Sequence, residues 1–161
     1  MSEAGQAAVD GRVVAIHIAE TVGAPMRALA RVQVATGLGL EGDRYARGEG
    51  YWSSDPRTDR EVTLVEEEEI QRLAASSGIE LAAGELRRNL TTSGVRLNDL
   101  VGKRFRVGGV TLEGTRLCEP CSYLQGLIAK AILEPLVHRA GLRAMIVEGG
   151  EISIGDVITV G

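Results

Sequence analysis

The sequence is poor in cysteine and histidine. Among its 161 residues the only cysteines are Cys118 and Cys121, and the only histidines are His17 and His138. Two cysteines are too few for the disulfide framework of a small secreted domain. A structural zinc site at the cysteine pair would need further Cys or His ligands, and the two histidines lie far apart in the sequence. The composition therefore argues against both a disulfide scaffold and a zinc module.

Long apolar runs are also absent. The best candidate, residues 127–137, is interrupted by Lys130 and Glu134 and is shorter than the roughly 20 residues that a membrane helix needs. The N-terminus lacks the basic and then apolar pattern of a signal peptide. We therefore expect a cytoplasmic protein with no membrane partner, in which residues 1–10 form a flexible N-terminal tail and residues 11–161 form a single domain.

The chain has no excess of positive charge. Its net charge of −4 argues against nucleic acid as a partner, because that interaction depends on basic residues. Of the 18 basic residues, 16 are arginine, and the only lysines are Lys103 and Lys130. This bias fits the codon usage of a GC-rich genome, and it also fits guanidinium groups that hold an anion by paired hydrogen bonds. The two interpretations are compatible.

Short runs rich in β-branched residues, separated by glycine turns, predict a mostly β protein. The expected strands cover residues 11–19, 28–35, 60–64, 103–107, 110–115, 143–148, 151–154 and 157–160. Hairpins are expected around the pairs Gly108-Gly109 and Gly149-Gly150, because such pairs suit two-residue turns.

Helices are expected at residues 66–77 and 122–138. Thr63 and Glu66 have the spacing of a capping box at the start of the first, and Gly78 suits its end. The acidic first turn matches the positive end of the helix dipole, which is preferred to a metal site as its explanation. Together the elements favour a mainly β fold with α: a partly closed, mostly antiparallel β-barrel with two principal helices.

The segment Arg116-Leu117-Cys118-Glu119-Pro120-Cys121-Ser122 lies where a strand is expected to give way to a helix. A helix N-terminus favours the thiolate form of a cysteine placed there. Arg116 would add positive charge, whereas Glu119 would oppose a thiolate at Cys118. Cys121 is therefore the candidate reactive centre, and Cys118 is a packed or resolving thiol. A redox disulfide between the two and an inert buried pair are the alternatives.

A second segment, residues 83–94, contains two guanidiniums, an amide and several hydroxyls between glycines. These groups suit a phosphate or another oxyanion. By itself the segment is more typical of an exposed basic loop.

A third segment, residues 37–45, is glycine-rich and leads into a long polar loop at residues 46–59. The lack of a Gly-Lys-Ser/Thr ending excludes a nucleotide phosphate loop. The loop is expected to be either a mobile lid over the site, which would carry Trp52, or plain surface.

Five short motifs follow one another along the chain. They are Gly-Leu-x-Gly-Asp-Arg, Val-Thr-Leu-x-Glu, Gly-Glu-x-Arg-x-Asn-Leu-Thr, Arg-x-Cys-x-Pro-Cys and His-Arg-x-Gly-Leu-Arg-Ala with its later Gly-Gly and Gly-Asp pairs. In this order they resemble the MOSC domain family, named for the C-terminal domain of molybdenum-cofactor sulfurase. The resemblance extends from about Gly37 to Gly161.

The resemblance implies a β-barrel that binds the molybdenum cofactor or acts beside enzymes that sulfurate it. It implies that Cys121 ligates molybdenum and that Arg88 and Asn89 contact the phosphate or the pterin. Arg87, Thr91 and Arg116 are further candidate contacts. The chemistry agrees, because a thiolate is a soft metal ligand and a guanidinium matches a phosphate.

Three functions remain open. The chain is expected to be an oxidoreductase that reduces N-hydroxylated compounds, as active relatives do, or a sulfur carrier with a persulfide on Cys121. The third possibility is a non-catalytic module that binds a partner protein or an anionic ligand. Partners would be the cofactor or a small anion, and a cysteine desulfurase or a redox protein. Neither Lys103 nor Lys130 lies in a Schiff-base motif, so pyridoxal phosphate is not expected.

Overall fold

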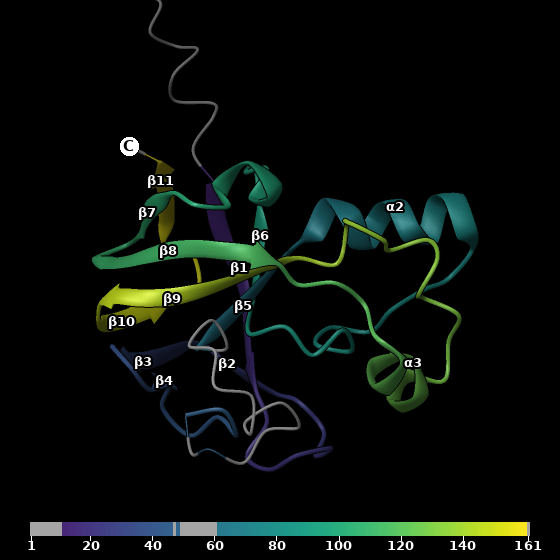
Figure 1. Ribbon diagram of the computed structural model, residues 1–161, viewed down its shortest axis with the longest axis horizontal. Coiled ribbons are helices and arrows are strands. Elements are labelled where there is room, and N and C mark those ends of the chain that lie inside the picture. The colour runs from purple at the N-terminus through teal and green to yellow at the C-terminus, as the bar shows by residue number, and fades with distance from the viewer. Residues whose placement is uncertain (1–10, 47, 49–60, 161) are drawn as a thin grey trace, which may run out of the picture.

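Seven strands form a closed barrel in the computed structural model, which describes residues 11–46, 48 and 61–160 (Figure 1). Around the barrel the strands are β11 (Val157–Val160), β7 (Arg104–Val107), β8 (Val110–Leu117), β9 (Leu142–Glu148), β5 (Val62–Glu66), β6 (Leu90–Ser93) and β1 (Gly11–Ile18). The barrel closes where β1 pairs with β11, with Gly11 opposite Ile158. Neighbouring strands of the barrel are antiparallel, except that β5 and β6 run parallel to each other. The predicted mostly antiparallel barrel is confirmed, and it is closed.

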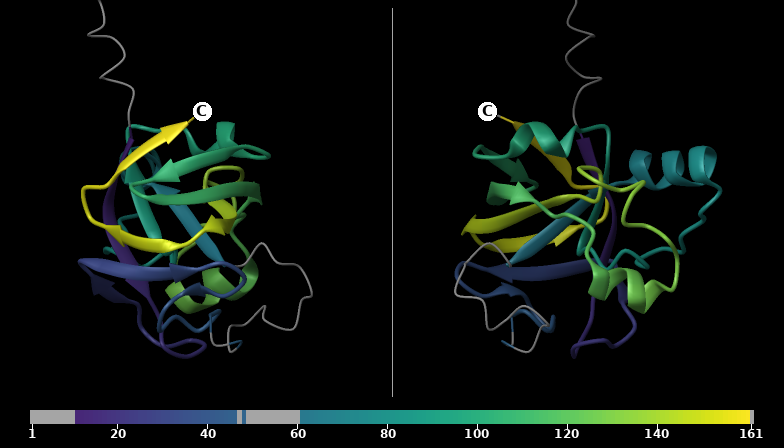
Figure 2. Two further views of the ribbon diagram at one scale, coloured as in Figure 1. Left: turned by 90° about the vertical axis from the view of Figure 1, so that its left-hand side faces the viewer. Right: turned by 45° about the vertical axis from the view of Figure 1, so that its right-hand side comes forward.

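The remaining elements lie outside this ring. Strand β2 (Arg27–Leu29) extends the sheet beyond β1, and β10 (Gly150–Ser153), β3 (Arg31–Ala35) and β4 (Gly39–Leu40) form a second, small sheet. The helices are α2 (Glu67–Ser77), a 3-10 helix η1 (Leu97–Leu100) and α3 (Ser122–Ile128). Figures 1 and 2 show α2 and α3 on the same side of the barrel. None of the helices in the described ranges is long and apolar enough to cross a membrane.

Two hydrophobic clusters follow from the alternation of side chains along β5. Leu64 points into the barrel and belongs to its core, whereas the next residue, Val65, points outward. Val65 packs with Leu73 of α2 and Leu124 of α3 in a second cluster. The two helices are therefore held against the outside of the barrel by a core of their own, and Cys121 of the β8–α3 connection packs against this second cluster.

One predicted hairpin is confirmed and the other is wrong. Strands β7 and β8 pair around Gly108-Gly109, with Val107 opposite Val110. Strands β9 and β10 do not pair, because β10 leaves the barrel and pairs with β3. A Cβ at Gly149 would lie 2.5 Å from the carbonyl oxygen of Val34, so glycine permits this close passage to the second sheet. The expected single strand at residues 28–35 is likewise divided between β2 and β3.

The helix predictions need two corrections. The expected capping box is absent: Thr63 lies within β5, where its hydroxyl donates to Asn89, and the N-cap of α2 is Glu66, which makes no side-chain capping bond. The helix ends at Gly78 as expected, with φ 71°. Helix α3 ends at Ile128 and does not reach residue 138. Ala129 adopts a left-handed φ of 60°, which terminates the helix.

The Glu66 side chain gives the barrel a testable pH dependence. It is only 6% exposed and accepts a hydrogen bond from the Leu97 backbone N–H. Burial raises the pKa of Glu66, and the nearby carboxylates of Glu68 and Glu69 raise it further, against the lowering effects of Leu97 and Arg96. A carboxyl group whose pKa is raised on folding favours the folded state when protonated and costs stability as the pH rises.

The Glu66→Gln variant should therefore lose less stability than the wild type between about pH 5 and about pH 7. Glutamine keeps an acceptor for Leu97 and carries no charge. Urea unfolding at both pH values measures the difference, with Glu67→Gln as the neighbouring control. The same pH dependence in the wild type and Glu66→Gln would contradict the prediction.

Candidate functional site

A narrow pocket of about 50 Å³ lies where the β8–α3 connection meets the loop after β4 and the loop before β6. Its lining residues are Arg44, Tyr45, Thr63, Arg87, Arg88, Asn89, Cys118, Glu119, Cys121, Tyr123, Leu124 and Arg143. Four of these are arginines and two are the cysteines of the chain. Of the predicted site residues, the pocket brings together Cys121, Arg87, Arg88 and Asn89. Thr91 lines a neighbouring cavity, and Arg116 is paired across the sheet with Arg143.

Cys121 is the N-cap residue of α3. Its backbone is extended, and its Sγ accepts a hydrogen bond from the Leu124 N–H at 3.5 Å. The side chain is partly exposed, whereas Cys118 is only 1% exposed and both thiols are free. Of the two, Cys121 is therefore the one that a ligand in the pocket can reach.

Arg88 holds the cysteine segment in place. Its Nη2 donates to the carbonyl oxygens of Cys118 and Glu119, at 2.9 and 3.4 Å. Its Nε donates to the carbonyl of Ala140 at 2.8 Å, and Nη1 donates to Leu86 at 3.3 Å. The guanidinium is thus largely engaged by the backbone of the protein itself, which makes Arg88 a positioning residue for the cysteines.

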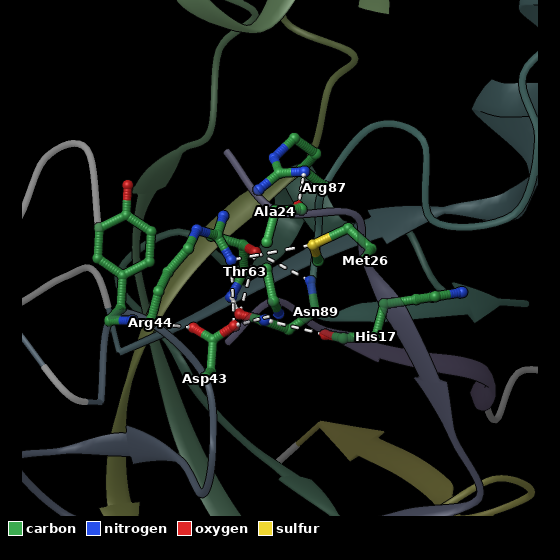
Figure 3. Close-up of polar contacts among 10 residues, drawn as sticks. His17, Ala24, Met26, Asp43, Arg44, Thr63, Arg87 and Asn89 are labelled. Carbon is green, nitrogen blue, oxygen red and sulfur yellow. Dashed lines mark hydrogen bonds and ion pairs between the residues drawn. The ribbon is translucent and has the colours of Figure 1, made fainter. Parts of the chain in front are cut away.

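Asn89 ties together two barrel strands. Its Oδ1 accepts hydrogen bonds from the backbone N–H and the hydroxyl of Thr63 in β5, at 3.1 and 3.2 Å. Its Nδ2 donates to the carbonyl of His17 in β1 at 3.1 Å (Figure 3). The side chain is 4% exposed, and these bonds use most of its hydrogen-bonding capacity. Contact of Asn89 with a cofactor remains a prediction.

Arg87 differs from Arg88 in having donors to spare. Its backbone has a left-handed φ of 63°, and its Nη1 donates to the carbonyl of Ala24 at 2.6 Å (Figure 3). Its Nη2 is buried and has no hydrogen-bond partner among the described residues. Burial lowers the pKa of Arg87 and the charge of Arg44 lowers it further, against the raising effects of Tyr123, Asp43 and Tyr45. An anion bound beside Arg87 would favour its charged form and so offset the lowering.

Arg44 is a site residue that the sequence did not single out. It is 8% exposed, and its Nη1 lies 3.0 Å from Asp43 Oδ1 (Figure 3). The Asp43 carboxylate also accepts hydrogen bonds from the backbone N–H groups of Ala19 and Tyr45. The Arg44 guanidinium lies 4.8 Å from the centre of the Tyr45 ring. The signal in the sequence is the Gly-Asp-Arg motif, which contributes to the family resemblance but assigns no role of its own to Arg44.

Glu119 makes other contacts than expected. Its Oε1 accepts the backbone N–H of His138 at 2.8 Å, and its Oε2 lies 2.6 Å from His138 Nδ1. Its carboxylate is thus held by His138, and no bond to the Cys118 thiol accompanies these contacts within the described ranges. The expected opposition between Glu119 and a Cys118 thiolate stays a prediction. The expected lid at residues 48–59, with Trp52, lies outside the described residues except for Gly48.

The comparisons with known proteins identify the family. A family model described as the MOSC domain matches residues 23–159, so this chain belongs to the MOSC domain family and the resemblance is confirmed. MOSC domains in general are associated with the molybdenum cofactor. No curated protein matches the chain.

Solved structures show the same fold. The YuaD protein from Bacillus subtilis has a TM-score of 0.78 and 19% identity, and the match covers 92% of this chain and 94% of YuaD. YiiM from Geobacillus stearothermophilus has a TM-score of 0.72 and 16% identity, with coverage of 94% and 75%. YiiM from Escherichia coli has a TM-score of 0.64 and 18% identity, with coverage of 93% and 69%. At such identities the likeness supports the fold alone.

Proposed function

We propose that this protein binds the molybdenum cofactor, with the Cys121 thiolate as a ligand of molybdenum and Arg87 as a contact to an anionic group of the cofactor. The observation that carries the proposal is the buried Nη2 of Arg87, which has no partner among the described residues and lines the same pocket as Cys121. A soft thiolate suits the metal, and an unpartnered guanidinium suits an oxyanion. The residues therefore fit the cofactor chemically.

Each residue would have a separate task. Cys121 would hold the metal through Sγ, and Arg88 would keep the Cys118–Cys121 segment in position through its bonds to the carbonyls of Cys118 and Glu119. Arg44, held by the Asp43 carboxylate that balances its charge, would line the pocket together with Arg87. A pocket of about 50 Å³ admits one end of a cofactor, and the rest would lie outside it.

When bound, the cofactor supplies oxygen-atom and electron transfer, which suits the reduction of N-hydroxylated compounds, and the protein supplies ligation, orientation and electrostatics. Asn89, Thr91 and Arg116 are further proposed contacts to the cofactor. A redox protein or a cysteine desulfurase is the proposed interaction partner.

Molybdenum content tests the proposal. The wild type, Cys121→Ser and Cys118→Ser are to be purified from a host that makes the cofactor and analysed for metal. We expect molybdenum in the wild type, nearly none in Cys121→Ser and most of it in Cys118→Ser, because Cys118 is buried and Cys121 is accessible.

Two results would count against it. Loading that survives the loss of Cys121 would assign the ligand to another residue. A wild type without molybdenum, whose intact mass shows one added sulfur atom that disappears in Cys121→Ser, would support the sulfur carrier in its place.

A further inference from the structure

A second, wider hollow also has Arg87 in its wall but neither of the cysteines. Its volume is about 260 Å³, compared with about 50 Å³ for the cysteine pocket. Its walls come from the β1–β2 loop, the loop before β6 and the end of α3, with Met26, Glu85, Arg87 and Leu127 among them. Arg87 lines both hollows, so it forms a shared wall between them. A cavity of roughly 150 Å³ already accepts benzene, so this hollow has room for a substituted ring.

Apolar side chains form one part of the wall of this hollow, beside polar atoms. Leu127 is 42% exposed, and Val22, which directly precedes Gly23 of the lining, is 48% exposed. Met26 lies beside Arg87 in the hollow and also contacts the Arg44 guanidinium through its sulfur, at 3.9 Å (Figure 3). Met26 and Leu127 therefore offer a surface on which the apolar part of a ligand can pack, next to the polar atoms of the same wall.

The charged groups of the hollow leave a net positive wall. The Glu85 carboxylate is engaged by Lys130 Nζ at 3.0 Å and by the Ala82 N–H at 2.8 Å. Although burial would raise the pKa of Glu85, these two partners lower it below its ordinary value. Its charge is therefore balanced by Lys130. Within the described residues Arg87 donates one hydrogen bond, to the carbonyl of Ala24, and its Nη2 has no partner there, so the guanidinium keeps donor capacity for an anion.

We propose that this second hollow binds a small organic molecule with an apolar body and a carboxylate or similar oxyanionic end, which Arg87 recognises. The apolar body lies against Met26 and Leu127, and the anionic end reaches the wall shared with the cysteine pocket. The assignment of this hollow as the substrate subsite rests on the proposed function. The binding of the molecule does not itself require a bound cofactor. It names a substrate class: anionic molecules about the size of one substituted ring.

Calorimetric titration of the purified wild type tests the proposal with three probes: phenylacetate, its neutral analogue phenylacetamide, and acetate. We expect phenylacetate to bind at least about tenfold more tightly than either of the others, because only phenylacetate has both the apolar body and the charge. Leu127→Glu should weaken phenylacetate by about tenfold or more, because it places a like charge at the mouth. Val137→Glu is the matched control, since Val137 is an exposed apolar residue that does not line the hollow (49% exposed). It should leave the affinity within about twofold.

Arg87→Met should abolish the preference for phenylacetate over phenylacetamide, because it removes the charge and keeps an extended side chain. The proposal is overturned if phenylacetate shows no binding at about 10 mM, or if Leu127→Glu binds it as well as Val137→Glu does. Molybdenum content measured on the same preparations separates the two proposals. Metal without phenylacetate binding refutes only the second site, and phenylacetate binding without metal refutes only the cofactor.

Discussion

Replacing Arg88 by alanine is expected to lower the free energy of unfolding by about 3–5 kcal/mol. The guanidinium donates to carbonyl oxygens of Leu86, Cys118, Glu119 and Ala140, and the side chain is 8% exposed. Removing it leaves these acceptors without their donor in a buried setting. Arg88→Lys should recover only a minor part of the loss, because one ammonium group cannot replace a planar fork. Urea unfolding measures both variants.

Arg72→Ala is the control for this prediction. Arg72 is also an arginine with hydrogen bonds, to Glu69 and Ser76, but its side chain is 42% exposed on α2. We expect a change within about 0.5 kcal/mol. If Arg88→Ala is as mild as Arg72→Ala, the bonds from Arg88 do not hold the cysteine segment, and a direct role in anion binding becomes the better explanation.

Gly141→Ala is expected to destabilise the protein by more than about 4 kcal/mol or to prevent folding. A Cβ at this position would overlap the carbonyl oxygen of Leu64, and the backbone φ of 123° is strained for any other residue. The Gly141 carbonyl also accepts the Cys118 N–H at 2.8 Å, so the strain would reach the site directly.

Thermal unfolding and soluble yield measure this effect. The control is Gly126→Ala in α3, where a Cβ meets no atom within 4 Å and the helix favours alanine. That variant should be neutral or more stable by up to about 1 kcal/mol. A folded Gly141→Ala protein with wild-type stability would show that the chain passes Leu64 less closely than described.

The fold was predictable from local patterns wherever partner strands are neighbours in sequence. The hairpin at Gly108-Gly109 follows from its turn and its flanking β-branched residues. The pair Gly149-Gly150 has the same local pattern, yet β10 pairs with β3, more than a hundred residues earlier in the chain. The length of α3 was also overestimated, because Gln125 accepts a hydrogen bond from Leu133 and the chain turns after Ile128. Long-range pairing and side-chain bonds of this kind leave no periodic signal.

The site was predictable in composition and less so in the task of each residue. The motifs identified Cys121, Arg87 and Arg88 as site residues, and all three line one pocket. Which arginine faces a ligand could not be inferred, because Arg87 and Arg88 are adjacent and chemically identical. Their difference comes from backbone conformation: the left-handed φ of Arg87 accompanies a contact to Ala24, whereas Arg88 reaches the carbonyls of the cysteine segment. The role of Asp43 in holding Arg44 could not be predicted either, because it depends on the long-range hydrogen bond from the Ala19 N–H to the Asp43 carboxylate.

The pairing of β1 with β11 constrains the order of events during synthesis on the ribosome. Gly11 pairs with Ile158, so β1 emerges long before the strand that completes its edge. Before β11 is synthesised, the backbone groups of Gly11 and Arg12 that pair with it can bond only to water, and the sheet stays open and curved. Closing so long a loop also slows folding, since its entropy cost precedes the contacts that offset it. Nascent chains halted before residue 157 should therefore be protease-sensitive and prone to self-association, and release of the last strand should convert them to the resistant form.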